Sequence, residues 1–156
     1  MSSRHRARRL ALQCLCCLDA QGDGAVELVH EFIDDSKEDD QAILAAHELA
    51  REAFADLAEC DLVLARHARH WELGRLALVD RNILRLGAFE LRTERAPKKV
   101  VITEAIRLAK EFSTAESPRF INGVLDAVAK ELGGDEKTGR DEGDEGDADS
   151  DREKRA

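Results

Sequence analysis

Two helix-forming patterns joined by a short polar hinge fill residues 100–126 and constrain the fold more than any other part of the chain. On each side of the hinge, apolar residues recur at spacings of three and four, as in an α-helix with one buried face. Ser117-Pro118 predicts the start of the second helix, because Ser is a good cap and Pro in the first turn loses no hydrogen bond. Gly123 lies inside that helix, where Gly costs about 1 kcal/mol relative to Ala, so we expect close packing against its backbone. The apolar positions are Ile102, Ala105, Ile106, Ala109 and Phe112, then Ile121, Val124, Leu125 and Val128.

The same helical period covers most of the chain before this segment. No stretch alternates with a two-residue period between turn signals, and no internal repeat is visible. The sequence therefore predicts an all-α fold of about six or seven helices. Asp39 is placed to cap the third of them. The expected helices cover residues 3–21, 25–33, 37–57 with a continuation of the pattern to 65, and 79–91, with a short connecting element at 71–76.

Composition predicts a single domain followed by a tail. The chain has 156 residues, of which 43% are apolar and 37% charged, which suits one globular domain. Residues 133–156 hold ten acids and five bases and no Val, Ile, Leu, Phe or Trp. Such a segment buries too little apolar surface to fold, so we expect a helical domain over 1–132 and a disordered acidic tail over 133–156.

Several classes of protein are disfavoured by what the sequence lacks. No apolar run approaches the length of a membrane span, and the Arg-rich start is not followed by a signal-peptide pattern, which favours a cytoplasmic protein. The four cysteines lack zinc-knuckle spacing, and three of them lie within four residues, where they cannot pair with one another. No nucleophile elbow or phosphate-binding Gly-rich loop is present. We predict no catalytic residues, no metal and no cofactor.

The N-terminal segment carries the densest positive charge in an acidic chain of net charge −9. A stripe of guanidinium groups neutralises phosphates, and an amide hydrogen-bonds base edges, so this pattern favours RNA binding. The alternative is an ordinary solvent-facing helix surface. Cations at a helix N-terminus are unfavourable by tenths of a kcal/mol each, which we interpret as a sign of function. The candidate RNA-binding residues here are Arg4, Arg6, Arg8, Arg9, Gln13 and Cys16.

Three groups of residues together resemble the NusB family of transcription antitermination factors. The first group is ITEAIRLAKEF (102–112) with the hinge and SPRFINGVLD (117–126). The second is Trp71 with VDRNILRLGAFEL (79–91), and the third is the Arg-rich start leading into ALQCL (11–15). The resemblance covers roughly residues 4–132. It implies a NusB-like fold and an Arg-rich first helix that binds the boxA element of ribosomal RNA leaders. Many relatives carry an aromatic where this chain has Cys16, which implies a weaker or altered RNA site.

The resemblance also extends the candidate site beyond the first helix. It places Glu116, Arg119 and Phe120 near the RNA surface, although Phe120 fits equally well as a core residue. It further implies a surface for the ribosomal protein NusE and a non-catalytic role in holding nascent RNA to RNA polymerase with other Nus factors. For Asp80 the local alternative is a helix cap. The residues implied for NusE are Glu72, Arg75, Asp80 and Arg81.

Two other functions remain open at this point. A NusB-like domain also occurs in some ribosomal RNA methyltransferases, so the chain could be an adaptor or subunit associated with RNA methylation. It has no Rossmann-like strand-turn-helix to bind the methyl donor. The other alternative is a purely protein-binding helical adaptor, in which the arginines contact an acidic partner.

Overall fold

The computed structural model describes residues 2–68 and 73–133. These residues form seven α-helices and two short 3-10 turns and no strand, which confirms the all-α prediction. The predicted tail and the predicted partner residue Glu72 lie outside the described residues, apart from Gly133. No helix in the described part is long and apolar enough to cross a membrane. The helices are α1 (Ser3–Gln21), α2 (Val26–Asp34), α3 (Asp40–Ala55), α4 (Leu57–His67), α5 (Leu78–Arg92), α6 (Lys98–Phe112) and α7 (Ser117–Leu132); the 3-10 turns are η1 (Asp23–Ala25) and η2 (Leu73–Arg75).

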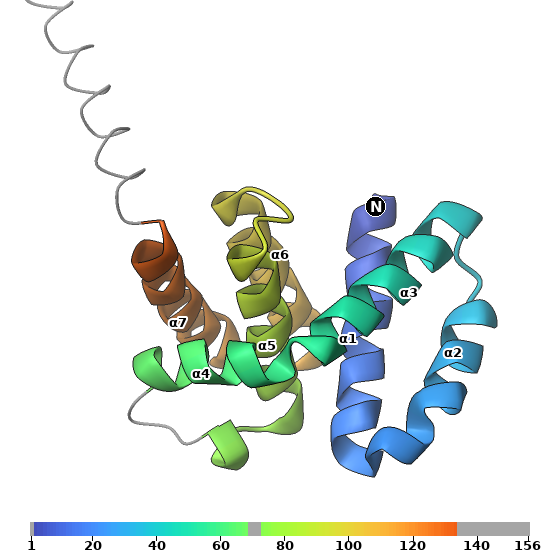
Figure 1. Cartoon of the computed structure of the whole chain (residues 1–156). Coiled ribbons are helices and arrows are strands. Elements are labelled where there is room, and N and C mark those ends of the chain that lie inside the picture. Colours follow the sequence, from blue (N-terminus) through green and yellow to red (C-terminus); the bar gives the residue numbers. More distant parts are fainter. Residues whose placement is uncertain (1, 69–72, 134–156) are drawn as a thin grey trace, which may run out of the picture.

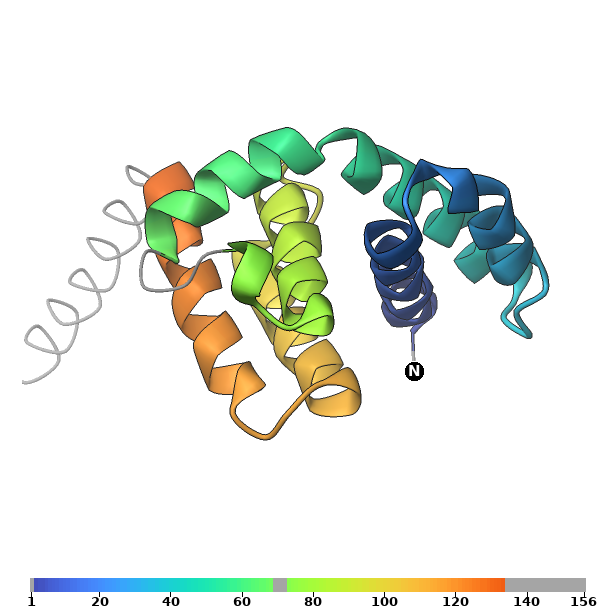
Figure 2. The same ribbon diagram turned by 90° about the horizontal axis from the view of Figure 1, so that it is seen from below.

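The helices pack as two groups that share one core. Helices α1, α2 and α3 form the first group and α4 to α7 the second, with α2 and α7 at opposite ends of the molecule (Figure 1). Viewed from below, α1 lies between α5 and the α2–α3 pair (Figure 2). The contact between α1 and α5 joins the two groups, so α1 is covered on most of its circumference. Leucines on α1, α5 and α7 are fully buried in the shared core: Leu12, Leu15, Leu84, Leu86 and Leu125.

Side-chain caps and one helix break explain where several helices begin and end. Asp39 accepts a hydrogen bond from the backbone N–H of Ala42 at 2.8 Å, as predicted for the start of α3. The apolar pattern that continued to residue 65 belongs to a second helix, because Asp56 leaves helical geometry (φ −101°, ψ 8°). The carboxylate of Asp56 receives two hydrogen bonds from Arg92 of α5, at 2.9 and 3.0 Å. This pair ties the break to the second group of helices.

The hinge before α7 differs from the prediction that Ser117 caps the helix. Glu116 is the N-cap residue and makes no side-chain capping bond, while Ser117 is already helical and buried. The Ser117 hydroxyl donates instead to Asp80 Oδ2 of α5 at 3.0 Å, and the Ser113 hydroxyl donates to Asp80 Oδ1 at 2.6 Å. A buried hydroxyl needs a partner, and Asp80 supplies one across the helix interface. Asp80 therefore joins α5 to the α6–α7 hinge and does not cap α5.

The expectation of close packing at Gly123 is wrong, and the close approach lies at Gly87. A Cβ at Gly123 would have no neighbouring atom within 4 Å, whereas one at Gly87 would lie 2.7 Å from Leu125 Cδ1. Leu125 is fully buried, so its side chain has little room to move. Gly87 therefore allows α5 and α7 to approach each other, and Gly123 carries the entropic cost of Gly without that benefit.

Replacing Gly123 with Ala is expected to stabilise the fold by up to about 1 kcal/mol, because Ala is the better helix former and meets no obstacle. Urea unfolding measures the change. The matched control is Gly87→Ala, which makes the same exchange in α5 and is expected to give a smaller gain or a loss. Equal stabilisation by both substitutions would contradict this account of the two glycines.

Candidate nucleic-acid interface

The candidate RNA-binding stripe of α1 is made of the partly exposed Arg6 and Arg9 and the exposed Gln13, with Cys16 half-buried at its C-terminal end. Arg6 pairs with Asp39 at 3.1 Å. Arg9 donates to Glu111 of α6 at 2.8 Å and lies 5.7 Å from the ring centroid of Phe112. Such partly exposed pairs contribute only about 0–1 kcal/mol each. Phosphate oxygens can therefore replace these carboxylates at little cost to the fold.

Arg4 and Arg8 lie on the other side of α1, one turn apart. Arg4 is exposed at the N-terminal end and makes no ion pair within the described residues. It lines a hollow of about 190 Å³ together with Glu48 of α3 and Arg95, which follows α5. Arg4 is thus an available cation at the edge of the site, separate from the stripe.

Arg8 differs from the other arginines of the candidate RNA-binding set, because its side chain is only 7% exposed. Its Nε and Nη2 donate to the carboxylate of Glu90 at 2.9 and 2.8 Å, and its Nη1 lies 3.6 Å from Glu104. Burial would lower the pKa of Arg8, but the hydrogen bonds and charge of Glu90 and Glu104 raise it. The guanidinium group is therefore charged and fixes α1 against α5 and α6. The Arg8 side chain thus faces α5 and α6.

The cations at the start of α1, which are unfavourable for the helix alone, make contacts that hold α1 to the rest of the fold. Arg6, Arg8 and Arg9 each have a carboxylate partner. His5 adds a fourth contact, with Nδ1 2.7 Å from Glu104 Oε1 in a buried position. Glu104 also accepts from Arg107 at 2.8 Å. The sequence analysis did not identify Glu90 and Glu104 as buried partners of the basic residues of α1. The signal that could have identified them is a carboxylate at an apolar position of the helical period in α5 and in α6.

Glu104 gives the fold a defined acid sensitivity. Burial would raise its pKa, but hydrogen bonds from His5 and Arg107 outweigh burial and lower it. A carboxylate with a lowered folded-state pKa stabilises the fold above its unfolded pKa of about 4.3, and this contribution is lost as the pH falls through the folded value. The free energy of unfolding at pH 7 is therefore expected to be larger for the wild type than for the Glu104→Gln variant. The difference between the two should shrink below about pH 4. Urea titrations at several pH values test this, and a constant difference would contradict it.

Three cysteines, Cys14 and Cys16 of α1 and Cys60 of α4, have thiols with a raised pKa. Burial raises the pKa of Cys14 and Cys60 to about 12, and burial together with Asp19 raises the pKa of Cys16 to about 11. Cys14 and Cys60 pack in the core as small apolar residues. Cys17 is half-buried and also packs against the core. Within the described ranges no cluster of His, Cys, Asp and Glu has a geometry suited to a metal ion.

The hinge before α7 brings together residues that the sequence analysis assigned to two different partners. A groove of about 200 Å³ is lined by Arg75 and Asp80 from the predicted NusE set and by Glu116 and Phe120 from the predicted RNA set. Phe120 is half-buried and packs on the core while one side faces this groove. Arg119 is exposed beside it. The two predicted surfaces therefore meet at the start of α7.

Arg81 belongs to an internal polar network and is not a freely exposed side chain. Its Nε donates to Asp19 Oδ2 at 2.8 Å, and Asp19 also accepts from Asn82 at 2.8 Å and Arg85 at 3.1 Å. Burial would raise the pKa of Asp19, but the bonds from Asn82 and Arg81 lower it. Arg85 extends the network with two bonds to Asp61 of α4. Asp19, which the sequence analysis did not single out, thus connects α1 to α5.

The fold and this surface define a class of small all-α proteins. Their first helix carries arginines and packs between α5 and the α2–α3 pair. The NusB family model matches residues 5–130. The chain therefore belongs to the NusB family.

Individual relatives agree with this assignment over most of the chain. The transcription antitermination protein NusB of Solibacter usitatus is 41% identical over 137 residues, which cover 85% of this chain and 92% of the relative. The solved structure of T. maritima NusB superimposes with a TM-score of 0.76 at 36% identity, covering 84% of this chain and 93% of that one. A crystal structure of the antitermination factors NusB and NusE in complex with dsRNA gives a TM-score of 0.75 at 30% identity, covering 83% and 98%.

Proposed function

We propose that this protein is a non-catalytic transcription antitermination factor that binds boxA-like single-stranded RNA together with NusE and helps to tether nascent RNA to elongating RNA polymerase. The observation that carries the proposal is the solvent-accessible Arg6–Arg9–Gln13 stripe on a helix whose position is fixed by buried ion pairs. Membership of the NusB family, and a relative crystallised with NusE and RNA, support the choice of partners.

In this proposal the exposed arginines bind phosphates and the buried arginine positions them. Arg6 and Arg9 exchange their carboxylate partners for phosphate oxygens, with Arg4 as a further cation at the helix start. Arg8 holds α1 against Glu90, so the stripe does not move when RNA binds. Gln13 supplies a hydrogen bond to a base edge. Cys16 cannot stack a base as an aromatic does, which removes a contribution of about 1–3 kcal/mol.

NusE supplies the second RNA-contacting surface in this scheme. The groove formed by Arg75, Asp80, Glu116 and Phe120 is the place where RNA and NusE would meet, and Arg119 adds a cation at its edge. Arg81 acts from within, by fixing α5 to Asp19. Two weak surfaces held together raise the local concentration of RNA and act as one stronger site.

Titration of labelled RNA tests the proposal directly. A boxA-like single strand and a scrambled strand of the same composition are added to the protein alone and to an equimolar mixture with NusE. We expect weak binding to the protein alone, a gain of about tenfold or more with NusE, and a preference for boxA in the mixture. No RNA binding under either condition, with NusE still bound, would favour the protein-binding adaptor instead.

A further inference from the structure

A groove between α1 and α2 borders the proposed RNA stripe at Gln13, and its other lining residues have no role in the proposed RNA site. It has a volume of about 330 Å³ and is lined by Gln13, Cys14 and Cys17 of α1 and by Leu28, Val29 and Phe32 of α2. Leu28 is 52% exposed and Phe32 is 43% exposed. The two residues are four positions apart, and therefore one turn apart on one face of α2. Helix α2 lies at the outer end of the molecule (Figure 1). The described part of the chain thus leaves two large apolar side chains on the wall of a hollow.

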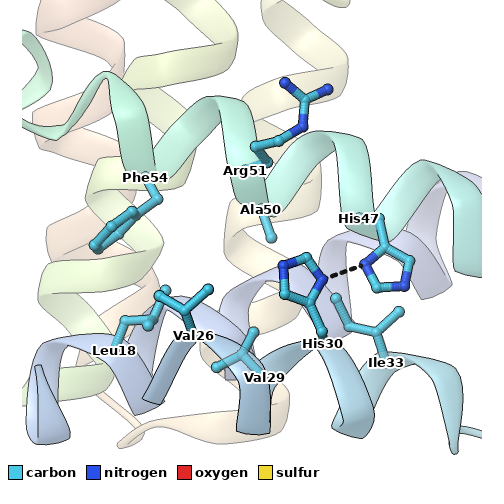
Figure 3. A pocket seen from close by; sticks show the side chains of 9 residues that line it. All are labelled: Leu18, Val26, Val29, His30, Ile33, His47, Ala50, Arg51 and Phe54. Atoms are coloured by element: carbon cyan, nitrogen blue, oxygen red, sulfur yellow. Dashed lines mark hydrogen bonds between the residues drawn. The ribbon is translucent and has the colours of Figure 1, made fainter. Parts of the chain in front are cut away.

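The opposite face of α2 is anchored, which fixes the direction of Leu28 and Phe32. Val26, His30 and Ile33 face α3 across a small apolar cavity (Figure 3). His30 Nδ1 lies 3.2 Å from His47 Nδ1, and His47 Nε2 lies 2.7 Å from Asp34 Oδ1, so a hydrogen-bonded chain links the two helices. With this face fixed, α2 cannot turn Leu28 and Phe32 into the core. Their exposure is a property of the folded helix.

Charge indicates what kind of molecule fits this groove. Glu27 and Glu31 are exposed, one turn apart, on the solvent side of Leu28. Neither makes an ion pair within the described residues. On the opposite wall, α1 contributes the neutral amide of Gln13. An acidic rim repels RNA phosphates and attracts lysine and arginine side chains.

We propose that the α1–α2 groove docks a basic amphipathic helix of a partner protein. Apolar anchors spaced by three or four residues would enter between Leu28 and Phe32, as in helix-in-groove recognition. Basic residues beside the anchors would pair with Glu27 and Glu31. The groove adjoins the proposed RNA stripe at Gln13 but uses the side of α1 that faces α2. Gln13 is the one residue common to the stripe and the groove lining, so Arg6 and Arg9 stay available to RNA when this partner is bound.

The test uses two synthetic helical peptides with the same leucine anchors, one with lysine at the flanking positions and one with glutamate. Fluorescence anisotropy measures the affinity of each peptide for the full chain. We expect the lysine peptide to bind about tenfold more tightly or better than the glutamate peptide. The paired change Glu27→Lys and Glu31→Lys should reverse this order.

Groove variants make the test specific. The double change Leu28→Ser and Phe32→Ser should weaken lysine-peptide binding by about tenfold or more. Leu62→Ser, which alters an exposed leucine on α4 away from the groove, should have no effect, and melting curves confirm that each variant is folded. Three outcomes would overturn the proposal: binding that survives the groove double change, loss of RNA affinity in that variant, or a concentration-dependent dimer that it abolishes. The second outcome would assign the groove to RNA, and the third to a second copy of this chain.

Discussion

Replacing Arg8 with Ala is expected to lower the free energy of unfolding by about 3–5 kcal/mol, the usual cost of breaking a buried ion pair from one side. The reason is the Glu90 carboxylate, which is only 4% exposed and would lose its bidentate partner. Glu104 would lose a neighbouring cation as well. Chemical denaturation followed by circular dichroism measures the loss.

Arg4→Ala is the matched control for this substitution. Arg4 is one turn away on the same side of α1, but it is exposed and makes no ion pair within the described residues, so its loss should change stability by no more than about 0.5 kcal/mol. Glu90→Ala should be as damaging as Arg8→Ala. An Arg8→Ala protein as stable as wild type would show that α1 is not held by this pair.

Replacing Asp19 with Ala is expected to cost roughly 3 kcal/mol, because it leaves Arg81 and Arg85 without the carboxylate they share. Both guanidinium groups are largely buried, with side chains 15% and 14% exposed. Asn82 also loses an acceptor. Since the network joins α1 to α5, the variant should melt earlier as a whole and not at one helix only.

Asp126→Ala provides the comparison for Asp19. Asp126 pairs with Lys130 on the exposed side of α7, where an i,i+4 pair contributes about 0.3–0.5 kcal/mol. The same loss of a carboxylate should therefore be nearly silent there. If both variants lost the same small amount, the Asp19 network would be no stronger than a surface ion pair.

The sequence was sufficient to predict the helices because each shows a clear apolar period and most carry a recognisable start or stop signal. It was insufficient where tertiary contacts decide. Asp56 interrupts a continuous apolar pattern because its carboxylate pairs with Arg92, 36 residues away. Gly87 and Gly123 look alike within their helices, and only the packing of Leu125 distinguishes them.

For the candidate site, the sequence predicted which residues share a side of α1 but not which of them are buried. Helical spacing correctly placed Arg6, Arg9 and Gln13 on one side of α1. It could not show that Arg8 is internal, because that depends on α5 and α6 covering the opposite side of the helix. The buried acids Glu90 and Glu104 carried the missing information, because a carboxylate on an apolar helix face needs a cationic or hydrogen-bonding partner. Arg8 is that partner for Glu90, and His5 and Arg107 are the partners of Glu104.

The salt dependence of RNA binding tests the central proposal most directly. The double change Arg6→Ala and Arg9→Ala removes two stripe cations and leaves Arg8 in place. The matched control is Arg51→Ala with Arg66→Ala, two exposed arginines on α3 and α4, of which Arg66 also has a carboxylate partner. We predict weaker binding to boxA-like RNA and a salt slope smaller by up to about 1.4, at 0.7 per lost phosphate contact on single strands, with no change in the control. The same affinity and slope in wild type and the stripe variant would contradict the assignment of α1 as the RNA-binding helix.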